Sequence, residues 1–165
     1  MKQKRRLEER FRPSAPCSCE TCVSYCMRPG WWTVNEAKAA FATGLAPRMM
    51  LEMAPDLSFG VLAPGFKGCE GGFARQNCWG CGCTFLHNRR CELFGSGFSP
   101  LECLFCHHER AGQGQACHAA IEKDWRANGQ ELVKRWVGLM GLWEPYALVS
   151  AYAHLETGAQ PAPFA

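Results

Sequence analysis

Cysteine is the residue type in this chain best suited to chemistry, and most of its 12 copies are close neighbours in the sequence. Three pairs have the Cys-x-x-Cys spacing: Cys19 and Cys22, Cys78 and Cys81, and Cys103 and Cys106. This spacing lets two sulfur atoms approach one ion at the roughly 2.3 Å of a zinc–thiolate bond. The pattern therefore predicts sites in which clustered cysteines bind metal ions.

The predicted metal ligands are the cysteines of these pairs and those that stand near them. They are Cys19, Cys22, Cys26, Cys78, Cys81, Cys83, Cys91, Cys103 and Cys106. Four residues stay open as further ligands or as ordinary side chains: Cys17, Cys69, Cys117 and His107. Thiolates favour two or more zinc ions, with iron or an iron–sulfur cluster as the alternative, whereas calcium and magnesium prefer oxygen.

Disulfide bonds are the competing explanation for so many cysteines. Residues 1–11 are mostly charged and contain no apolar segment, so we expect no secretory signal and a cytoplasmic location. Disulfides are rare in that compartment, and cysteines this close together more often share a metal ion. No apolar run reaches the roughly 20 residues of a membrane helix, so a membrane is not an expected partner.

The formal net charge of +3 counts every thiol as neutral. A cysteine that binds a metal is a thiolate, so a zinc ion with four cysteines carries a net charge of about −2. Two such sites would change the net charge from +3 to about −1. Nucleic acid is therefore not an expected partner, and a nucleic-acid-binding zinc module is only an alternative function.

Two motifs resemble enzyme signatures but lack the order or the context that the chemistry needs. His107, His108 and Glu109 are in the wrong order for the His-Glu-x-x-His motif of a metalloprotease. The segment 78–81 has the spacing of a redox dithiol, but no strand-to-helix pattern surrounds it. We therefore predict a mainly non-catalytic structural or interaction role, with an iron-dependent or iron–sulfur redox protein as the alternative.

Two capping boxes predict the helices nearest to the cysteines. One box, Thr33 with Glu36, opens a helix over residues 34–43. The other, Ser99 with Glu102, opens a helix from Pro100 to Arg110. That second helix would place three candidate ligands on one face: Cys103, Cys106 and His107.

The remaining sequence predicts a small fold with one hairpin and several helices. The expected elements are a short helix over 47–53, a strand over 57–62 in a long loop, a hairpin over 83–94, two helices that Asn128-Gly129 separates, and a last helix from Pro145 to Gly158. Five tryptophans are expected to anchor the core: Trp31, Trp32, Trp125, Trp136 and Trp143.

The predicted fold class is an α-rich, small, metal-stabilised domain of α+β type. It has a short β-hairpin, an irregular cysteine-rich half and C-terminal helices. Residues 1–16 are expected to form a basic flexible arm, residues 17–158 a single cysteine-cluster metal-binding domain, and residues 159–165 a frayed tail.

Two segments carry a resemblance to a known family. They are Cys83-Thr-Phe-Leu-His-Asn-Arg-Arg-Cys91-Glu-Leu-Phe with Pro100-Leu-Glu-Cys103, and Cys19-x-x-Cys22-x-x-x-Cys26 with Arg28-Pro-Gly-Trp31. They resemble the YkgJ-type cysteine-cluster proteins, which are described as zinc- or iron-chelating. By position, the resemblance implies six ligands: Cys19, Cys22, Cys26, Cys83, Cys91 and Cys103. Leu104 stands where the family usually has arginine, and Cys78, Cys81 and Cys106 are additional to its pattern.

Overall fold

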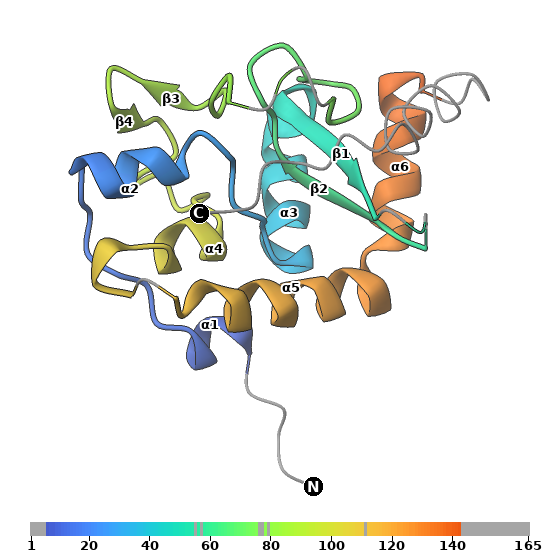
Figure 1. The fold of residues 1–165 in the computed structure, drawn as a ribbon. Coiled ribbons are helices and arrows are strands. Elements are labelled where there is room, and N and C mark those ends of the chain that lie inside the picture. The colour runs from blue at the N-terminus through green and yellow to red at the C-terminus, as the bar shows by residue number, and fades with distance from the viewer. Residues whose placement is uncertain are drawn as a thin grey trace, which may run out of the picture.

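Two unlike halves lie side by side in the computed structural model, which describes residues 6–54, 56, 58–75, 78, 80–110 and 112–142 (Figure 1). In the tryptophan half (residues 31–64 and 113–142), three helices pack around a hairpin: α3 (Val34–Ala40), α5 (Gly114–Asn128) and α6 (Gln130–Met140) around β1 (Met49–Met53) and β2 (Gly60–Pro64). In the cysteine half (residues 12–30 and 65–110), turns join short elements: α2 (Glu20–Tyr25), β3 (Leu86–His87), β4 (Arg90–Cys91) and α4 (Leu101–Phe105). This combination of helices and short hairpins confirms the predicted fold class.

Three tryptophans with no exposed surface form the centre of the tryptophan half: Trp32, Trp125 and Trp136. Each indole N–H donates to a backbone carbonyl at 2.7–2.8 Å, Trp32 to Phe98, Trp125 to Trp32 and Trp136 to Ala46. Because the polar atom of each ring has a partner, the whole ring can be buried without an unsatisfied donor. The predicted core role of these residues is confirmed.

α3 begins with the predicted capping box. The Thr33 hydroxyl accepts a hydrogen bond from the Glu36 amide at 3.2 Å, and the Glu36 carboxylate accepts one from the Thr33 amide at 2.8 Å. Asp124 on α5 adds a further cap by accepting from the Val34 amide at 2.9 Å. The helix continues as a π-helical turn, Phe41–Leu45, so the element expected over 34–43 is confirmed.

The segment predicted as a short helix, residues 47–53, is mostly strand, and that prediction is wrong. A 3-10 turn, Ala46–Arg48, leads into β1, which pairs antiparallel with β2. The first three residues of β1 are all buried: Met49, Met50 and Leu51. A run that is apolar at every position suits a strand covered on both faces as well as a buried helix, so the local pattern does not separate them. The strand expected over 57–62 overlaps β2 at residues 60–62, and residue 57 lies outside the described residues.

β3 and β4 form the small hairpin expected over residues 83–94. Asn88 and Arg89 connect the two strands, with φ angles of +48° and +64°. Positive φ at both positions is the geometry of a type I′ turn, whose twist matches that of the strands it joins. The hairpin carries Cys91 on its second strand.

α4 is shorter than the helix predicted there. It ends at Phe105, and Cys106 has an extended backbone, with ψ of 104°. A separate 3-10 turn, η4 (His108–Arg110), follows. The prediction that Cys103, Cys106 and His107 share one helical face is therefore wrong.

The capping box predicted at Ser99 and Glu102 is also wrong. The residue before the helix is Pro100, without a side-chain cap. The Glu102 carboxylate instead accepts from the Trp31 amide at 2.6 Å and lies 2.6 Å from Nδ1 of His118. Glu102 therefore links α4 to two neighbouring segments and does not cap the helix.

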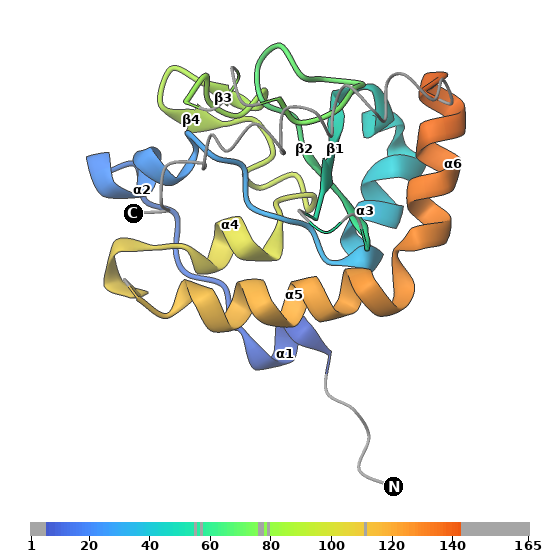
Figure 2. The ribbon, with the colours of Figure 1, turned by 45° about the vertical axis from the view of Figure 1, so that its right-hand side comes forward.

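Part of the expected flexible arm, residues 1–16, packs against the rest of the protein. Its helix α1 (Leu7–Arg10) lies beside α5 (Figure 2). Phe11 is buried, and its ring meets that of Phe105 edge-on, with centroids 5.3 Å apart. The boundaries of the domain stay predictions.

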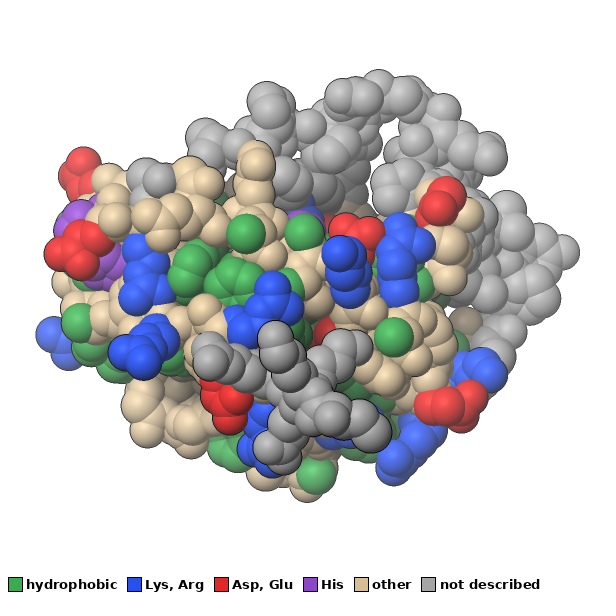
Figure 3. All heavy atoms as spheres, turned by 90° about the horizontal axis from the view of Figure 1, so that it is seen from below, with side chains coloured by type: hydrophobic (Ala, Val, Ile, Leu, Met, Phe, Trp, Pro, Cys, Tyr) green, Lys and Arg blue, Asp and Glu red, His purple; other side chains and the backbone are tan. Residues whose placement is uncertain are grey.

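The face below α1 and α5 shows side chains of both charges. Lys and Arg are interspersed there with acidic and apolar side chains (Figure 3). Within the described ranges, none of the helices is long and apolar enough to cross a membrane. Trp143, the helix expected from Pro145 to Gly158 and the tail over 159–165 lie outside those ranges.

Candidate metal centre

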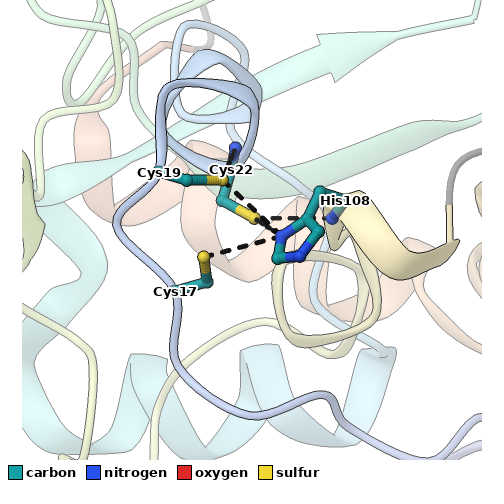
Figure 4. A group of neighbouring side chains, drawn as sticks. All are labelled: Cys17, Cys19, Cys22 and His108. Carbon is teal, nitrogen blue, oxygen red and sulfur yellow. Dashed lines mark hydrogen bonds between the residues drawn. The ribbon is translucent and has the colours of Figure 1, made fainter.

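Three cysteines from the N-terminal segment meet one histidine from η4 (Figure 4). Cys17 precedes α2, Cys19 is the residue that caps this helix, and Cys22 lies in its first turn. His108 opens η4, 86 positions after Cys22. The four ligand atoms all lie within 4.8 Å of one another, so this group, which we call the first site, can hold a metal ion.

The distances in the first site fit tetrahedral coordination of one ion. The Sγ atoms of Cys17 and Cys19 each lie 3.6 Å from His108 Nδ1, and that of Cys22 lies 3.3 Å from it. With metal–sulfur and metal–nitrogen bonds of roughly 2.3 and 2.0 Å, a tetrahedral angle places sulfur and nitrogen about 3.5 Å apart. The side chains therefore already have the spacing of ligands on a single ion.

Backbone amides point at the sulfurs of the first site. The Cys22 amide donates to Cys19 Sγ at 3.5 Å, and the His108 amide donates to Cys22 Sγ at 3.4 Å. The first of these bonds, aided by the Cys17 thiol, lowers the pKa of Cys19 to about 7. Burial, opposed by the His108 amide, raises the pKa of Cys22 to about 11. A bound cation favours the thiolate form of both residues.

Two neighbours position the ligands of the first site. The His107 ring lies against that of His108, with centroids 4.2 Å apart, and its Nδ1 accepts from the Glu109 amide at 3.2 Å. The Arg89 guanidinium, at the tip of the β3–β4 hairpin, donates to the Ser18 carbonyl at 3.4 Å. His107 thus supports a ligand, and it also forms a possible metal-binding group with His108 and Glu109 that shares His108 with the first site.

Only two residues of the first site, Cys19 and Cys22, are among the ligands predicted from the sequence. The sequence does not decide whether Cys17 is a ligand, and the compact spacing of the three cysteines is the only sign that it could be. His108 was missed because the helix predicted through Arg110 gave it no role on the cysteine-bearing face. Its partners are distant in sequence, so no local pattern identifies it.

Four other predicted ligands lie around the place where α2, the β3–β4 hairpin and α4 meet: Cys26, Cys83, Cys91 and Cys103. Their thiols interact electrostatically, but no three of their sulfurs all lie within 4.8 Å of one another. The Cys83 amide donates to the Cys26 carbonyl at 2.8 Å. The Gly30 amide donates to Cys103 Sγ at 3.3 Å, and a Cβ at Gly30 would stand only 2.8 Å from that sulfur. This group, which we call the second site, joins three segments that are far apart in the sequence.

The thiols of the second site interact electrostatically. Burial, with the nearby charge of Cys91, raises the pKa of Cys26. Burial also raises the pKa of Cys83 to about 12, with Cys91 and Cys26 adding to the effect. Loss of hydration and the charges of Cys83 and Cys26 raise the pKa of Cys103 well above its ordinary value. Thiolates in this group would repel one another, and a bound cation removes that repulsion.

The remaining cysteines lie outside these two groups. Cys78 and Cys81 are near Cys69, on the turns that follow β2. Cys106 lies beside the second site, where burial and nearby negative charges raise its pKa to about 12. Cys117 has no exposed surface and packs within the core from α5.

Comparison with known proteins gives this chain no relative. It matches no protein-family model, no curated protein and no solved structure. The resemblance to the YkgJ-type cysteine-cluster proteins therefore stays a prediction. What the structure shows is a cysteine–histidine group with the geometry of a metal site.

Proposed function

We propose that this chain is a zinc-binding protein in which metal ions hold the cysteine half together. The observation that carries the proposal is the first site, where three sulfurs lie 3.3–3.6 Å from one imidazole nitrogen. Four ligands from the chain complete a tetrahedral zinc site, and a site filled by protein ligands is structural rather than catalytic. The role of this ion is to join the N-terminal segment to η4.

Zinc suits the ligands of the first site better than the alternatives do. Thiolates and imidazole in tetrahedral geometry suit Zn²⁺, whereas calcium and magnesium take oxygen ligands. In an iron–sulfur cluster the cysteines are divided among two or four iron atoms, so the four ligand atoms do not surround one ion. Ligand atoms that all lie within 4.8 Å of one another have the spacing of a single ion.

We assign a second zinc ion to the second site. Its cysteines supply four thiolates, a complete ligand set for structural zinc. All four belong to the ligands that the YkgJ-type resemblance implies, whereas Cys19 and Cys22 belong to the first site. The proposal thus divides the implied ligand set between two ions, and it supports the expectation of two or more zinc ions.

Elemental analysis of the purified chain and its ligand variants tests this proposal. We expect His108→Ala to lower the zinc content by one equivalent per chain, and Cys91→Ser to lower it by one equivalent at the second site. His87→Ala is the matched control, because this histidine is 59% exposed on the hairpin and lies near Glu92. Unchanged zinc in His108→Ala contradicts the proposal, and so does a wild-type protein that contains iron and absorbs visible light.

A further inference from the structure

A pocket of about 690 Å³ opens where α1, η4 and the start of α5 meet. Its lining comes from three stretches of chain: residues 9–12, Phe105 with Arg110, and residues 112, 113, 115 and 116. The Arg110 guanidinium donates to the Arg12 carbonyl and so joins two of these stretches. The volume lies in the range of pockets that bind small organic molecules.

Two phenylalanine rings line this pocket, and each carries a guanidinium. The ring centroid of Phe11 lies 5.3 Å from Cζ of Arg10, and that of Phe105 lies 4.8 Å from Cζ of Arg110. A guanidinium is attracted to the face of an aromatic ring at such distances. These contacts hold two positive charges beside an apolar surface, which suits a ligand with both a charged and an apolar part.

Positive charge is in excess in this pocket. Arg10, Arg12 and Arg110 face a single acidic residue, Glu9, which leaves a net charge of +2. Among the described residues, no carboxylate forms a salt bridge with any of these three guanidiniums. The Glu9 carboxylate instead accepts from the Arg6 amide at 3.3 Å. Because guanidiniums that stand close together repel one another, an anion in the pocket is favoured.

A phosphate monoester matches the charge and the donors of this pocket. Near pH 7 it carries about −1.5 to −2 and offers three acceptor oxygens. The planar fork of a guanidinium donates two parallel hydrogen bonds to such oxygens. A carboxylate carries only one negative charge and two oxygens, so it would offset less of the positive charge.

We propose that this pocket binds a small phosphate monoester with an apolar body. Arg10, Arg12 and Arg110 hold the phosphate, and the apolar body packs beside the rings of Phe11 and Phe105. The ligand binds without covalent change. The pocket contains none of the proposed metal ligands, so this proposal and the proposed function can fail separately.

Calorimetric titration of the full-length chain with phenyl phosphate tests the pocket. We expect saturable binding that weakens as the salt concentration rises. Arg10→Gln and Arg12→Gln should each raise the Kd about tenfold, because each removes a charged hydrogen-bond donor. Both side chains are exposed, so their replacement leaves the core packing intact.

Arg135→Gln is the matched control for these variants. Arg135 is an exposed arginine on α6, outside the pocket, and its Cζ lies 5.4 Å from the ring centroid of Phe41. The substitution removes the same charge and the same kind of ring contact as Arg10→Gln does. We expect the Kd for phenyl phosphate to stay at the wild-type value.

Benzoate and inorganic phosphate, titrated separately, test the class of ligand. We expect both to bind more weakly than phenyl phosphate, because benzoate has the ring with a single charge and inorganic phosphate has no ring. The absence of saturable binding of phenyl phosphate to the wild type overturns the proposal. An unchanged Kd in both Arg10→Gln and Arg12→Gln also overturns it, as does an equal loss of affinity in Arg135→Gln. Benzoate that binds as tightly as phenyl phosphate overturns the assignment of a phosphate ligand.

Discussion

The tryptophan half and the cysteine half differ in what keeps their segments in place. In the first, three fully buried indoles fill the space between α3, α5 and α6. In the second, α2 and α4 have six and five residues, and α2 buries none of its side chains. Helices that short are not stable on their own, and of the two only α4 packs side chains, Leu101 and Phe105, into the core. The difference leads us to expect that the proposed zinc ions contribute more to the stability of the cysteine half than to that of the tryptophan half.

Metal removal is expected to separate the two halves most strongly. A chelator should release amide protection in the cysteine half, since the binding free energy of a structural zinc, about 10 kcal/mol or more, is also folding free energy. Backbone amides in the tryptophan half should continue to exchange slowly, because the core of that half contains no proposed metal ligand. Hydrogen exchange read by mass spectrometry, with and without chelator, measures both. Equal loss in the two halves would contradict the division.

Trp125→Ala should destabilise the tryptophan half even when zinc is saturating. We expect the free energy of unfolding to fall by about 4 kcal/mol, because a large buried ring leaves a cavity that only partly collapses. Urea denaturation measures this change. Leu139→Ala is the matched control on α6, since Leu139 is 60% exposed, and it should change stability by less than about 0.5 kcal/mol. Comparable effects in the two variants would argue against a tryptophan-based core.

Thr33→Ala tests the segment that leads from the cysteine half into α3. Loss of the hydroxyl that accepts from the Glu36 amide should cost about 1 kcal/mol of stability. Thr33→Ser keeps that hydroxyl and should remain close to wild type. Denaturant unfolding at saturating zinc compares the two, and equal destabilisation would mean that packing of the Thr33 methyl, rather than the cap, is responsible.

His118 on α5 and Glu102 on α4 join the halves through a pH-dependent contact. Burial lowers the pKa of His118, but its hydrogen bond to Glu102 and the carboxylate charge outweigh burial and raise it. A raised folded-state pKa means that the contact stabilises the protein fully below the ordinary value of about 6.5 and is lost as the pH rises through the folded-state pKa. With His118 35% exposed, the expected size is below about 1 kcal/mol. His118→Gln should remove this part of the pH dependence of unfolding, and an unchanged profile would count against the contact.

The elements that the sequence predicts correctly are those whose signals are local. The capping box of Thr33 and Glu36 and the hairpin over 83–94 each depend on residues a few positions apart. The segment that forms β1 was predicted as a helix. Its run of apolar residues suits a buried helix as well as a strand, and only the distant segments that cover both faces of β1 decide between the two. In the correct predictions the decisive contacts join residues a few positions apart, whereas for β1 they come from distant parts of the chain.

The candidate site divides in the same way. The spacing of Cys19 and Cys22 is enough to predict that both bind one ion. The grouping of Cys26 with Cys83, Cys91 and Cys103 depends on where α2, the hairpin and α4 meet. His108 joins the three cysteines from η4, a turn that follows the end of α4 at Phe105 and that the predicted continuous helix did not include.

The first site has a mechanical consequence, because its ligands stand 86 positions apart in the chain. A zinc ion bound by Cys22 and His108 closes the intervening chain into a ring. When the two ends of the protein are pulled apart, that ring stays outside the path of the force. Because the second ion closes the chain from Cys26 to Cys103 inside the same ring, bonds at both zinc ions must break before the full hidden contour length, about 300 Å, is released. With both ions removed, the same chain should lengthen without these ruptures.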